Sequence, residues 1–361
     1  MCGWAVLAAL AAGAPAPAAT SEADAAWKQI EQVRQSLGKL SGEKPAAKFS
    51  RRLGPQAEER SPRIGGLALL QQHLAYFLRR FPDDAHALLA RAWWVEVTPE
   101  VAEGLAVALD RARWDEERAR LELATDVPPK VRAQVDAAIL NARLRELALP
   151  GAAPEKTAQF VARLEEFVTR HKGEASRANY AFILGTMLRL SDEARADRAF
   201  AIAAASADPA LAGRGARARA ALPYFHRPLD LSFTALDGRR VDLAALRGKV
   251  VVVDFWATWC GPCVEDLPEL LALYREFHPR GVEVVGVSLD TERKKLGDFV
   301  KARGMDWPQF FDGGGWDNKL ARRFQIGSIP ALWVVGKDGR LIDVEARGKL
   351  RALLPPLLAQ K

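Results

Sequence analysis

Cysteine is scarce in this sequence, which limits what the chain can be. The 361 residues include three cysteines, Cys2, Cys260 and Cys263. Cys2 lies in a segment interpreted below as a targeting signal, which leaves one pair for the rest of the chain. Two cysteines separated by two residues cannot join distant parts of a fold, so a scaffold of structural disulfides is excluded. The five histidines are scattered and offer no zinc-binding set. We therefore predict a redox pair, with no metal and no cofactor.

Long apolar runs and blocks of one charge are also missing. No segment after the N-terminus is long and apolar enough to span a bilayer. The formal net charge is +7, yet basic and acidic residues interleave along most of the chain, as between Arg111 and Arg120. We interpret this as a solvated surface of mixed sign, with weak attraction to anionic lipid or an acidic partner as the alternative. Because no basic run is interleaved with aromatic residues, we predict no nucleic-acid partner.

The N-terminal residues 1–20 have the pattern of a secretory signal. An apolar stretch from Trp4 to Ala12 precedes small residues that end at Thr20, as in a signal and its cleavage site. No Lys or Arg precedes the apolar stretch, although such signals usually begin with one. We predict export, with a periplasmic location, and keep a tail on a cytoplasmic protein as the alternative.

Glycine is sparse over residues 24–222, a region that is rich in Ala, Leu, Arg and Glu. Apolar residues recur at helical spacing in two pairs of segments, which predicts an all-α region. We expect one helix to end at Phe81-Pro82 and the next to run from Ala85 to about Val97. The pairs are loosely similar to tetratricopeptide repeats, without a strict period of about 34 residues. This region either presents a concave surface to a protein partner or only holds the domain that follows.

Residues 226–361 have a different sequence pattern, in which short β-rich runs alternate with helical ones. Asp237-Gly238 predicts a hairpin turn. Helices are expected after Cys260 to about Phe277, over Lys294–Ala302, and from Leu350 to Leu358 with a break at Pro355-Pro356. Strands are expected over Val250–Phe255, Val282–Val287, Leu332–Val335 and Leu341–Val344, with the last two antiparallel. The sequence therefore predicts two domains, an all-α helical-repeat-like region over 24–222 and an α/β domain with a mixed sheet over 226–361.

The two cysteines fall where the first buried strand gives way to a helix. Cys260 is placed at the helix N-terminus, where unpaired N–H groups and the helix dipole stabilise a thiolate. Cys263 follows one helical turn later, within reach to close a disulfide. We expect Cys263 to be the more buried of the two and to resolve a mixed disulfide formed by Cys260.

In these motifs residues 226–361 resemble the thioredoxin superfamily, and within it the TlpA/ResA-like thiol–disulfide oxidoreductases. The resemblance covers about the last third of the chain. It rests on Trp259-Cys260-Gly261-Pro262-Cys263, on Ser328-Ile329-Pro330, on the hairpin that leads through Leu246–Lys249, and on the inserted strand and helix over Val282–Arg303.

The resemblance implies a site in which Pro330 is cis and presents the backbone of Ile329 to a substrate chain beside Cys260. Trp259, Gly261 and Pro262 would complete the substrate-facing rim. It also implies an exported enzyme that reduces protein disulfides, such as those of apocytochrome c or copper-assembly proteins, and that is re-reduced by a membrane thiol donor. Gly-Pro between the cysteines resembles reducing thioredoxins.

The resemblance also implies that two acids are candidates for proton transfer to and from the second cysteine. Asp254 lies within the apolar strand, where loss of solvent should raise its pKa. We expect its effect on exchange to be largest at acidic to neutral pH. Asp266 stands where the TlpA/ResA-like branch usually has the longer Glu, so it is either a second proton-transfer group or a partner of the helix dipole.

Two other functions remain open at this point. A peroxiredoxin-type thiol peroxidase would need a Thr three residues before its reactive Cys with a Pro before that, whereas Thr258 is two residues before Cys260. A helical-repeat adaptor would bind a partner through residues 24–222 and leave the redox domain subordinate.

Overall fold

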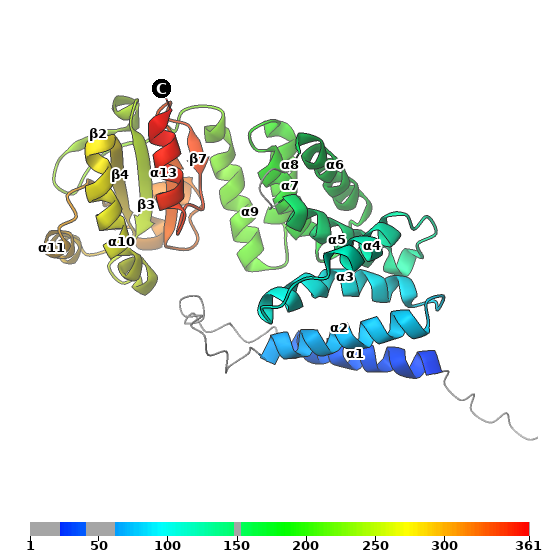
Figure 1. The fold of residues 1–361 in the computed structure, drawn as a ribbon. Helices are drawn as coiled ribbons and strands as arrows, with labels where there is room; N and C mark the ends of the chain where they lie inside the picture. Colours follow the sequence, from blue (N-terminus) through cyan, green and yellow to red (C-terminus); the bar gives the residue numbers. More distant parts are fainter. Residues whose placement is uncertain (1–21, 41–61, 148–152, 361) are drawn as a thin grey trace, which may run out of the picture. The chain divides into compact units, whose positions relative to one another are not determined.

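The computed structural model describes residues 22–40, 62–147 and 153–360. The predicted signal, residues 1–20, lies outside the described residues. The chain divides into two compact units, Met1–Phe160 and Val161–Lys361. This division falls inside helix α6 (Pro154–Arg170), whereas the change from helices to mixed α/β structure falls near residue 222 (Figure 1). Within the described part of the chain, no helix is long and apolar enough to cross a membrane.

The first unit is built from helices around a core rich in tryptophan. Its elements are α1 (Glu22–Leu40), α2 (Pro62–Arg80), α3 (Ala87–Gly104), α4 (Arg111–Glu122) and α5 (Pro129–Leu147). The apolar residues whose helical spacing predicts α2 are buried, namely Leu67, Leu70, Leu74, Phe77 and Leu78. Trp93 stacks on Trp27 with ring centroids 5.1 Å apart, and Trp93 and Trp94 are both buried.

Helix α3 differs from its predicted bounds, since it begins at Ala87 and continues past Val97 to Gly104 with Pro99 inside it. A proline within a helix leaves the carbonyl four residues earlier without its usual N–H donor. Here that carbonyl belongs to Val95, and the indole Nε1 of Trp114 donates to it at 2.8 Å. Packing against α4 thus replaces the missing helical hydrogen bond and lets the helix continue.

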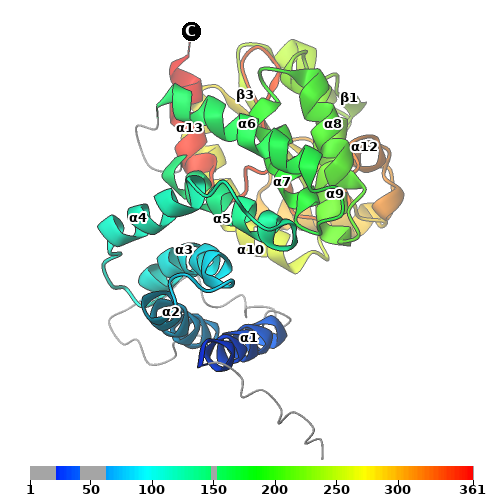
Figure 2. The ribbon, with the colours of Figure 1, turned by 90° about the vertical axis from the view of Figure 1, so that its right-hand side faces the viewer.

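The second unit begins with three further helices after α6. These are α7 (Arg177–Leu188), α8 (Glu193–Ala204) and α9 (Pro209–Ala221). They lie side by side in Figures 1 and 2, and α8 contacts both of its neighbours. Asp192 and Asp208 cap α8 and α9 by accepting hydrogen bonds from the backbone N–H groups of Arg195 and Ala210. The apolar residues whose helical spacing predicts α6 and α7 are buried, among them Phe160, Leu164 and Phe167 in α6 and Tyr180 and Leu184 in α7.

Residues 222–360 form a mixed sheet covered by helices, as the sequence predicts. The five-stranded sheet has the order β5-β4-β3-β6-β7, and β1 pairs with β2 in a separate hairpin. The strands are β1 (Ser232–Thr234), β2 (Arg240–Asp242), β3 (Val250–Trp256), β4 (Val282–Ser288), β5 (Gln309–Phe310), β6 (Ala331–Val335) and β7 (Leu341–Asp343). The helices are α10 (Gly261–Phe277), α11 (Arg293–Arg303), α12 (Lys319–Arg323) and α13 (Leu350–Ala359), with short 3-10 turns η1 (Leu222–Phe225), η2 (Leu243–Leu246), η3 (His278–Arg280) and η4 (Gly315–Asp317).

The register of the sheet decides which loops meet. Strand β3 is parallel to β4, with Trp256 opposite Ser288, and antiparallel to β6, with Phe255 opposite Ala331. The carboxyl ends of β3 and β4 and the amino end of β6 therefore share one edge. The loops that contain Cys260, Asp290 and Pro330 leave the sheet at this edge.

The last helix also differs from its prediction, because α13 runs through Pro355 and Pro356 to Ala359 without a break. Leu350, Leu354 and Leu357 are buried beneath it, whereas both prolines face solvent. The carbonyls that lose their helical donors, on Arg351 and Ala352, belong to exposed residues where water can replace them. Burial of one face thus outweighs the local preference of proline for a helix end.

The contact of α8 with α9 depends on a glycine. A Cβ atom at Gly215 would lie 2.4 Å from the backbone nitrogen of Ala204. We expect Gly215→Ala to lower the free energy of unfolding by about 1–3 kcal/mol, because backbone cannot give way as a side chain can. Gly213→Ala on the same helix is the control, since its Cβ would meet only Arg217 Nη1 at 3.7 Å. Denaturant unfolding of both variants tests this; equal stability would show that the helices can separate at no cost.

Candidate functional site

The reactive turn begins where β3 ends. All seven residues of β3 are buried, as expected for a central strand covered on both faces. Cys260 caps α10 with extended backbone angles, and its Sγ accepts a hydrogen bond from the N–H of Cys263 at 3.3 Å. Gly261 and Pro262 form the first turn, where a proline costs no helical hydrogen bond. Cys260 therefore lies at the positive end of the helix dipole, as predicted.

Cys260 and Cys263 are joined by a disulfide, with their Cα atoms 5.3 Å apart. Their exposed fractions are 5% and 6%, so the expected difference in burial is wrong for this oxidised form. The reason is that each sulfur covers the other once they are bonded. Trp259, Gly261 and Pro262 are exposed around the pair.

The substrate-facing loop predicted by the resemblance lies at the same edge of the sheet. The Ile329–Pro330 bond is cis, and both residues are half-buried. Ser328, which precedes them, accepts a hydrogen bond from Nη1 of Arg217 at 3.4 Å. Arg217 belongs to α9, a helix that the sequence pattern assigned to a separate region. Burial lowers the pKa of Arg217 below the usual range of arginine.

Asp254 is a carboxyl group in the middle of the core. It lies in register between Gly286 of β4 and Leu332 of β6 and is 6% exposed. Burial raises the pKa of Asp254 to about 7, and the negative charge of Asp266 adds to this rise. Asp254 can therefore exchange a proton near neutral pH.

Asp266 has a partner that the sequence did not indicate. Nε of Arg347 donates to its Oδ2 at 2.5 Å, and Nη2 donates to its Oδ1 at 3.1 Å. This bidentate pair raises the pKa of Arg347. Asp266 thus acts on Asp254 through its charge while both of its own oxygens are occupied by a guanidinium.

A buried polar network supports the turn before the cysteines, and sequence reasoning missed it. Asp290 is 2% exposed and accepts hydrogen bonds from the N–H of Thr258 at 3.0 Å and from its Oγ1 at 2.5 Å. Oγ of Ser288 also donates to Oδ2 of this carboxylate, at 2.8 Å. The position of Asp290 just after β4 was a usable signal, since the ends of neighbouring parallel strands meet at one edge.

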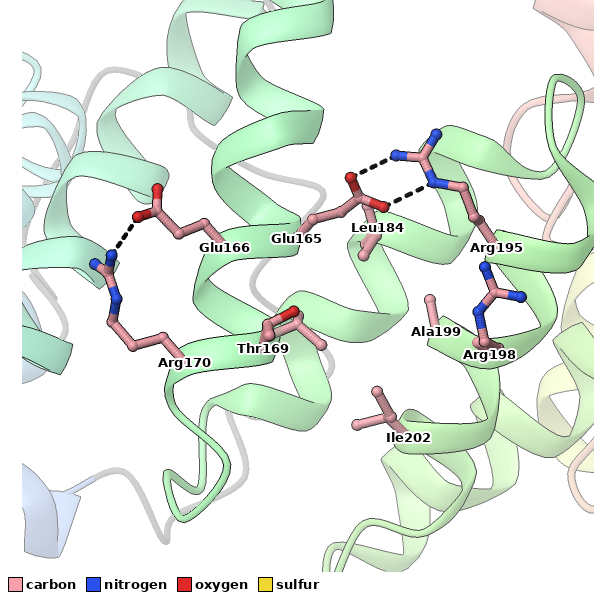
Figure 3. A pocket seen from close by; sticks show the side chains of 10 residues that line it. Glu165, Glu166, Thr169, Arg170, Leu184, Arg195, Arg198, Ala199 and Ile202 are labelled. Carbon is pink, nitrogen blue, oxygen red and sulfur yellow. Dashed lines mark hydrogen bonds and ion pairs between the residues drawn. The ribbon is translucent and has the colours of Figure 1, made fainter.

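A hollow of about 680 Å³ lies apart from this edge, among α6, α7 and α8. Figure 3 shows Glu165 of α6 and Arg195 of α8 pointing toward each other across it. Nε of Arg195 donates to Oε1 of Glu165 at 2.8 Å, and Arg170 pairs with Glu166 on the same helix. Because these charges pair with one another, we interpret the hollow as a groove between helices.

Comparison with known proteins finds similarity in the C-terminal part of the chain. Residues 221–344 match the sequence model of a family described as the AhpC/TSA family. A protein of Bacillus anthracis named thiol-disulfide oxidoreductase ResA is 31% identical over 110 residues, which are 30% of this chain and 62% of that relative. The protein of the same name from Bacillus subtilis (strain 168) is 29% identical over 108 residues, 30% of this chain and 59% of that relative.

A solved structure, the thiol:disulfide interchange protein of the thioredoxin family from Chlorobium tepidum TLS, is 24% identical, with a TM-score of 0.33 and coverage of 37% of this chain and 96% of that one. The chain spans about three fifths of the length of the two curated relatives, both named ResA. Residues 221–344 are a thioredoxin-like domain similar to proteins with these names.

The raised pKa of Asp254 makes the stability of the domain depend on pH. The unfolded carboxyl titrates near 4 and the folded one near 7, so the folded state holds the extra proton between these values. Stability should therefore fall as pH rises from about 4 to about 7. We expect Asp254→Asn to lose this dependence of stability on pH. At pH 8 its free energy of unfolding should exceed that of wild type by up to about 4 kcal/mol.

Calorimetric unfolding of the oxidised protein from pH 4 to pH 8 measures this difference. Asp230→Asn is the control, because it removes a carboxylate that is 84% exposed. Parallel pH profiles for wild type and Asp254→Asn would contradict a buried, protonated Asp254.

Proposed function

We propose that the thioredoxin-like domain is a thiol–disulfide oxidoreductase that reduces protein disulfides through Cys260 and Cys263. The observation that carries the proposal is the place of Cys260 at the start of α10, where its Sγ accepts the N–H of Cys263. In the reduced protein, the same N–H and the helix dipole would stabilise a thiolate. The similarity to proteins named thiol-disulfide oxidoreductase supports the same activity.

The exchange would proceed in two steps. The thiolate of Cys260 attacks one sulfur of a client disulfide, which forms a mixed disulfide and releases the other client sulfur as a thiolate. Cys263 then loses its proton and attacks Sγ of Cys260, which frees the second client thiol and closes the Cys260–Cys263 disulfide. Two electrons pass to the client, and a thiol donor must return them before the next cycle.

Asp254 is the best candidate to accept the proton from Cys263. Its burial in β3, the strand that leads to the cysteines, raises its pKa to about 7, so it is partly ionised and partly neutral at physiological pH. Asp266 is the weaker candidate, because Arg347 occupies both of its oxygens. Ile329 and Pro330, with Trp259, Gly261 and Pro262, would form the rim that holds the client chain.

The setting of this activity follows from the N-terminal pattern and the resemblance. We propose that the protein is exported to the periplasm, acts on disulfides such as those of apocytochrome c or copper-assembly proteins, and is re-reduced by a membrane thiol donor. Residues 24–222 would either bind a protein partner or only hold the thioredoxin-like domain 226–361. In the adaptor alternative, binding by the helices would persist when both cysteines are replaced.

A peroxidase of the peroxiredoxin type would need a threonine close to its reactive cysteine. The hydroxyl of Thr258 donates a hydrogen bond to Asp290, so it is committed to supporting the turn. Consumption of hydrogen peroxide by the reduced protein, dependent on Cys260, would favour a peroxidase over a reductase.

The roles of the two cysteines can be separated by substitution. We expect Cys260→Ser to reduce insulin only at the background rate, because the attacking thiolate is gone. Cys263→Ser should instead accumulate a long-lived mixed disulfide on Cys260, which mass spectrometry would locate. Cys2→Ser, outside the pair, should retain the wild-type rate. Adducts on Cys263 in the Cys260→Ser protein at the wild-type rate would reverse the assignment.

The pKa of Asp254 also defines a pH window for catalysis. Below about pH 7 the carboxyl is protonated, and above about pH 8.5 a thiol ionises unaided. We therefore expect Asp254→Asn to slow insulin reduction most between these values, by up to about 100-fold. The pH range in which Asp254 should matter most is therefore higher than the acidic-to-neutral range that the sequence alone suggests. Asp266→Asn should cost less; the reverse ranking, per folded molecule, would make Asp266 the proton-transfer group.

A further inference from the structure

Two exposed tryptophans stand beside the reactive turn. Among the described residues from 222 to 360, the large apolar side chains that are exposed are Trp259, at 50%, and Trp316, at 48%. The two are in contact, with ring centroids 5.9 Å apart and an angle of 58° between the rings. Trp259 directly precedes Cys260, whereas Trp316 comes from η4, which follows β5. Exposed tryptophans that contact each other form an apolar patch, and exposed apolar patches rich in aromatic residues are typical of interaction sites.

The backbone around Trp316 is firmly held. Asp312 accepts hydrogen bonds from the N–H groups of Gly314 at 3.0 Å and Lys319 at 2.8 Å. Gly315 has a φ of +57°, and a Cβ there would approach Cγ2 of Thr291 to 3.2 Å. The loop thus turns tightly against the chain that follows β4, so its position is fixed before any partner binds.

One buried segment, Ser288–Asp290, supports both tryptophans. Asp290 binds the N–H and hydroxyl of Thr258, the residue before Trp259. The carbonyl of Ser288 accepts a hydrogen bond from Nδ2 of Asn318 at 3.0 Å, two residues after Trp316. Ser288 and Asn318 are fully buried. The pair of rings is therefore preorganised by the same polar network that positions the cysteines.

We propose that Trp259 and Trp316 form a client-contact surface that binds an apolar side chain of the client segment next to the cysteine under attack. This proposal rests on the proposed disulfide exchange and deepens it. The occupant follows from the chemistry, because attack places a client sulfur at Cys260, one residue from Trp259. Cys260 is 5% exposed, so the flanking client residues must lie against its immediate rim. An aromatic pair offers them a large rigid surface at small entropic cost.

Trp316 is the residue to test, since it lies outside the reactive turn. We would compare two disulfide-linked peptides that differ only in Leu or Ser beside the cysteine, with hydroxyethyl disulfide as a substrate too small to reach the rings. Trp316→Ala should lower kcat/KM about tenfold for the Leu peptide, mainly through KM. It should leave hydroxyethyl disulfide and the Ser peptide near their wild-type rates.

Two variants control for indirect effects. Trp316→Phe keeps an aromatic ring and should retain most of the preference for the Leu peptide. Leu190→Ala removes another exposed apolar side chain, 64% exposed on the helical part of the same unit, and should change nothing. An equal loss on all three substrates would make Trp316 a structural support and overturn the proposal.

The remaining outcomes also decide. If the wild-type protein reduced none of the substrates, the proposed function would fail. In that case, calorimetric titration of the Cys260→Ser/Cys263→Ser protein with cysteine-free Leu and Ser peptides would still test the surface. Equal affinity for both peptides, or no binding, would overturn it. Self-association that disappears in Trp316→Ala, with no peptide preference, would assign the pair to a second copy of this chain instead.

Discussion

The arrangement of the loops around Cys260 depends on the burial of strand β3 on both faces, at the centre of the sheet. Its seven residues are enclosed, so its register with β4 and β6 cannot slip without exposing apolar side chains or burying polar ones. That register brings the ends of three strands to one edge. The disulfide, the cis proline and Asp290 occupy the three loops that leave there, although they are far apart along the chain.

A carboxyl group within this strand works against stability. Asp254 is enclosed with its pKa raised to about 7, and an apolar residue would pack there without that penalty. Nearby, Asp266 forms an ion pair with Arg347, and its negative charge still adds to the rise in the pKa of Asp254. The proposed proton transfer would account for this cost, because it needs a group that titrates near neutral pH.

The polar network of Ser288, Asp290 and Asn318 has the opposite character, since its buried groups are paired. It ties the turn before Cys260 to the loop that carries Trp316. The proposed nucleophile and the proposed client-contact surface beside it are thereby held by one set of hydrogen bonds, which would limit the entropy lost when a client chain binds. Helix α9 reaches the same edge through Arg217 and Ser328, so the helices that precede the domain contribute to its rim.

Much of this could be predicted from the sequence, because it follows from local patterns. Apolar periodicity located helices such as α2, α6 and α7, and the run Val250–Phe255 indicated a buried strand. The turn from that strand into a helix placed Cys260 at a helix N-terminus. Only the tertiary structure decided the pairs Thr258–Asp290, Asp266–Arg347 and Trp259–Trp316, whose members lie far apart in sequence and carry no local signature. Tertiary packing also lets α3 continue past Pro99, because a hydrogen bond from Trp114 replaces the one that proline removes. Local propensity reports what a segment prefers alone, whereas side-chain contacts across the sheet edge arise only once the register of β3 has brought the loops together.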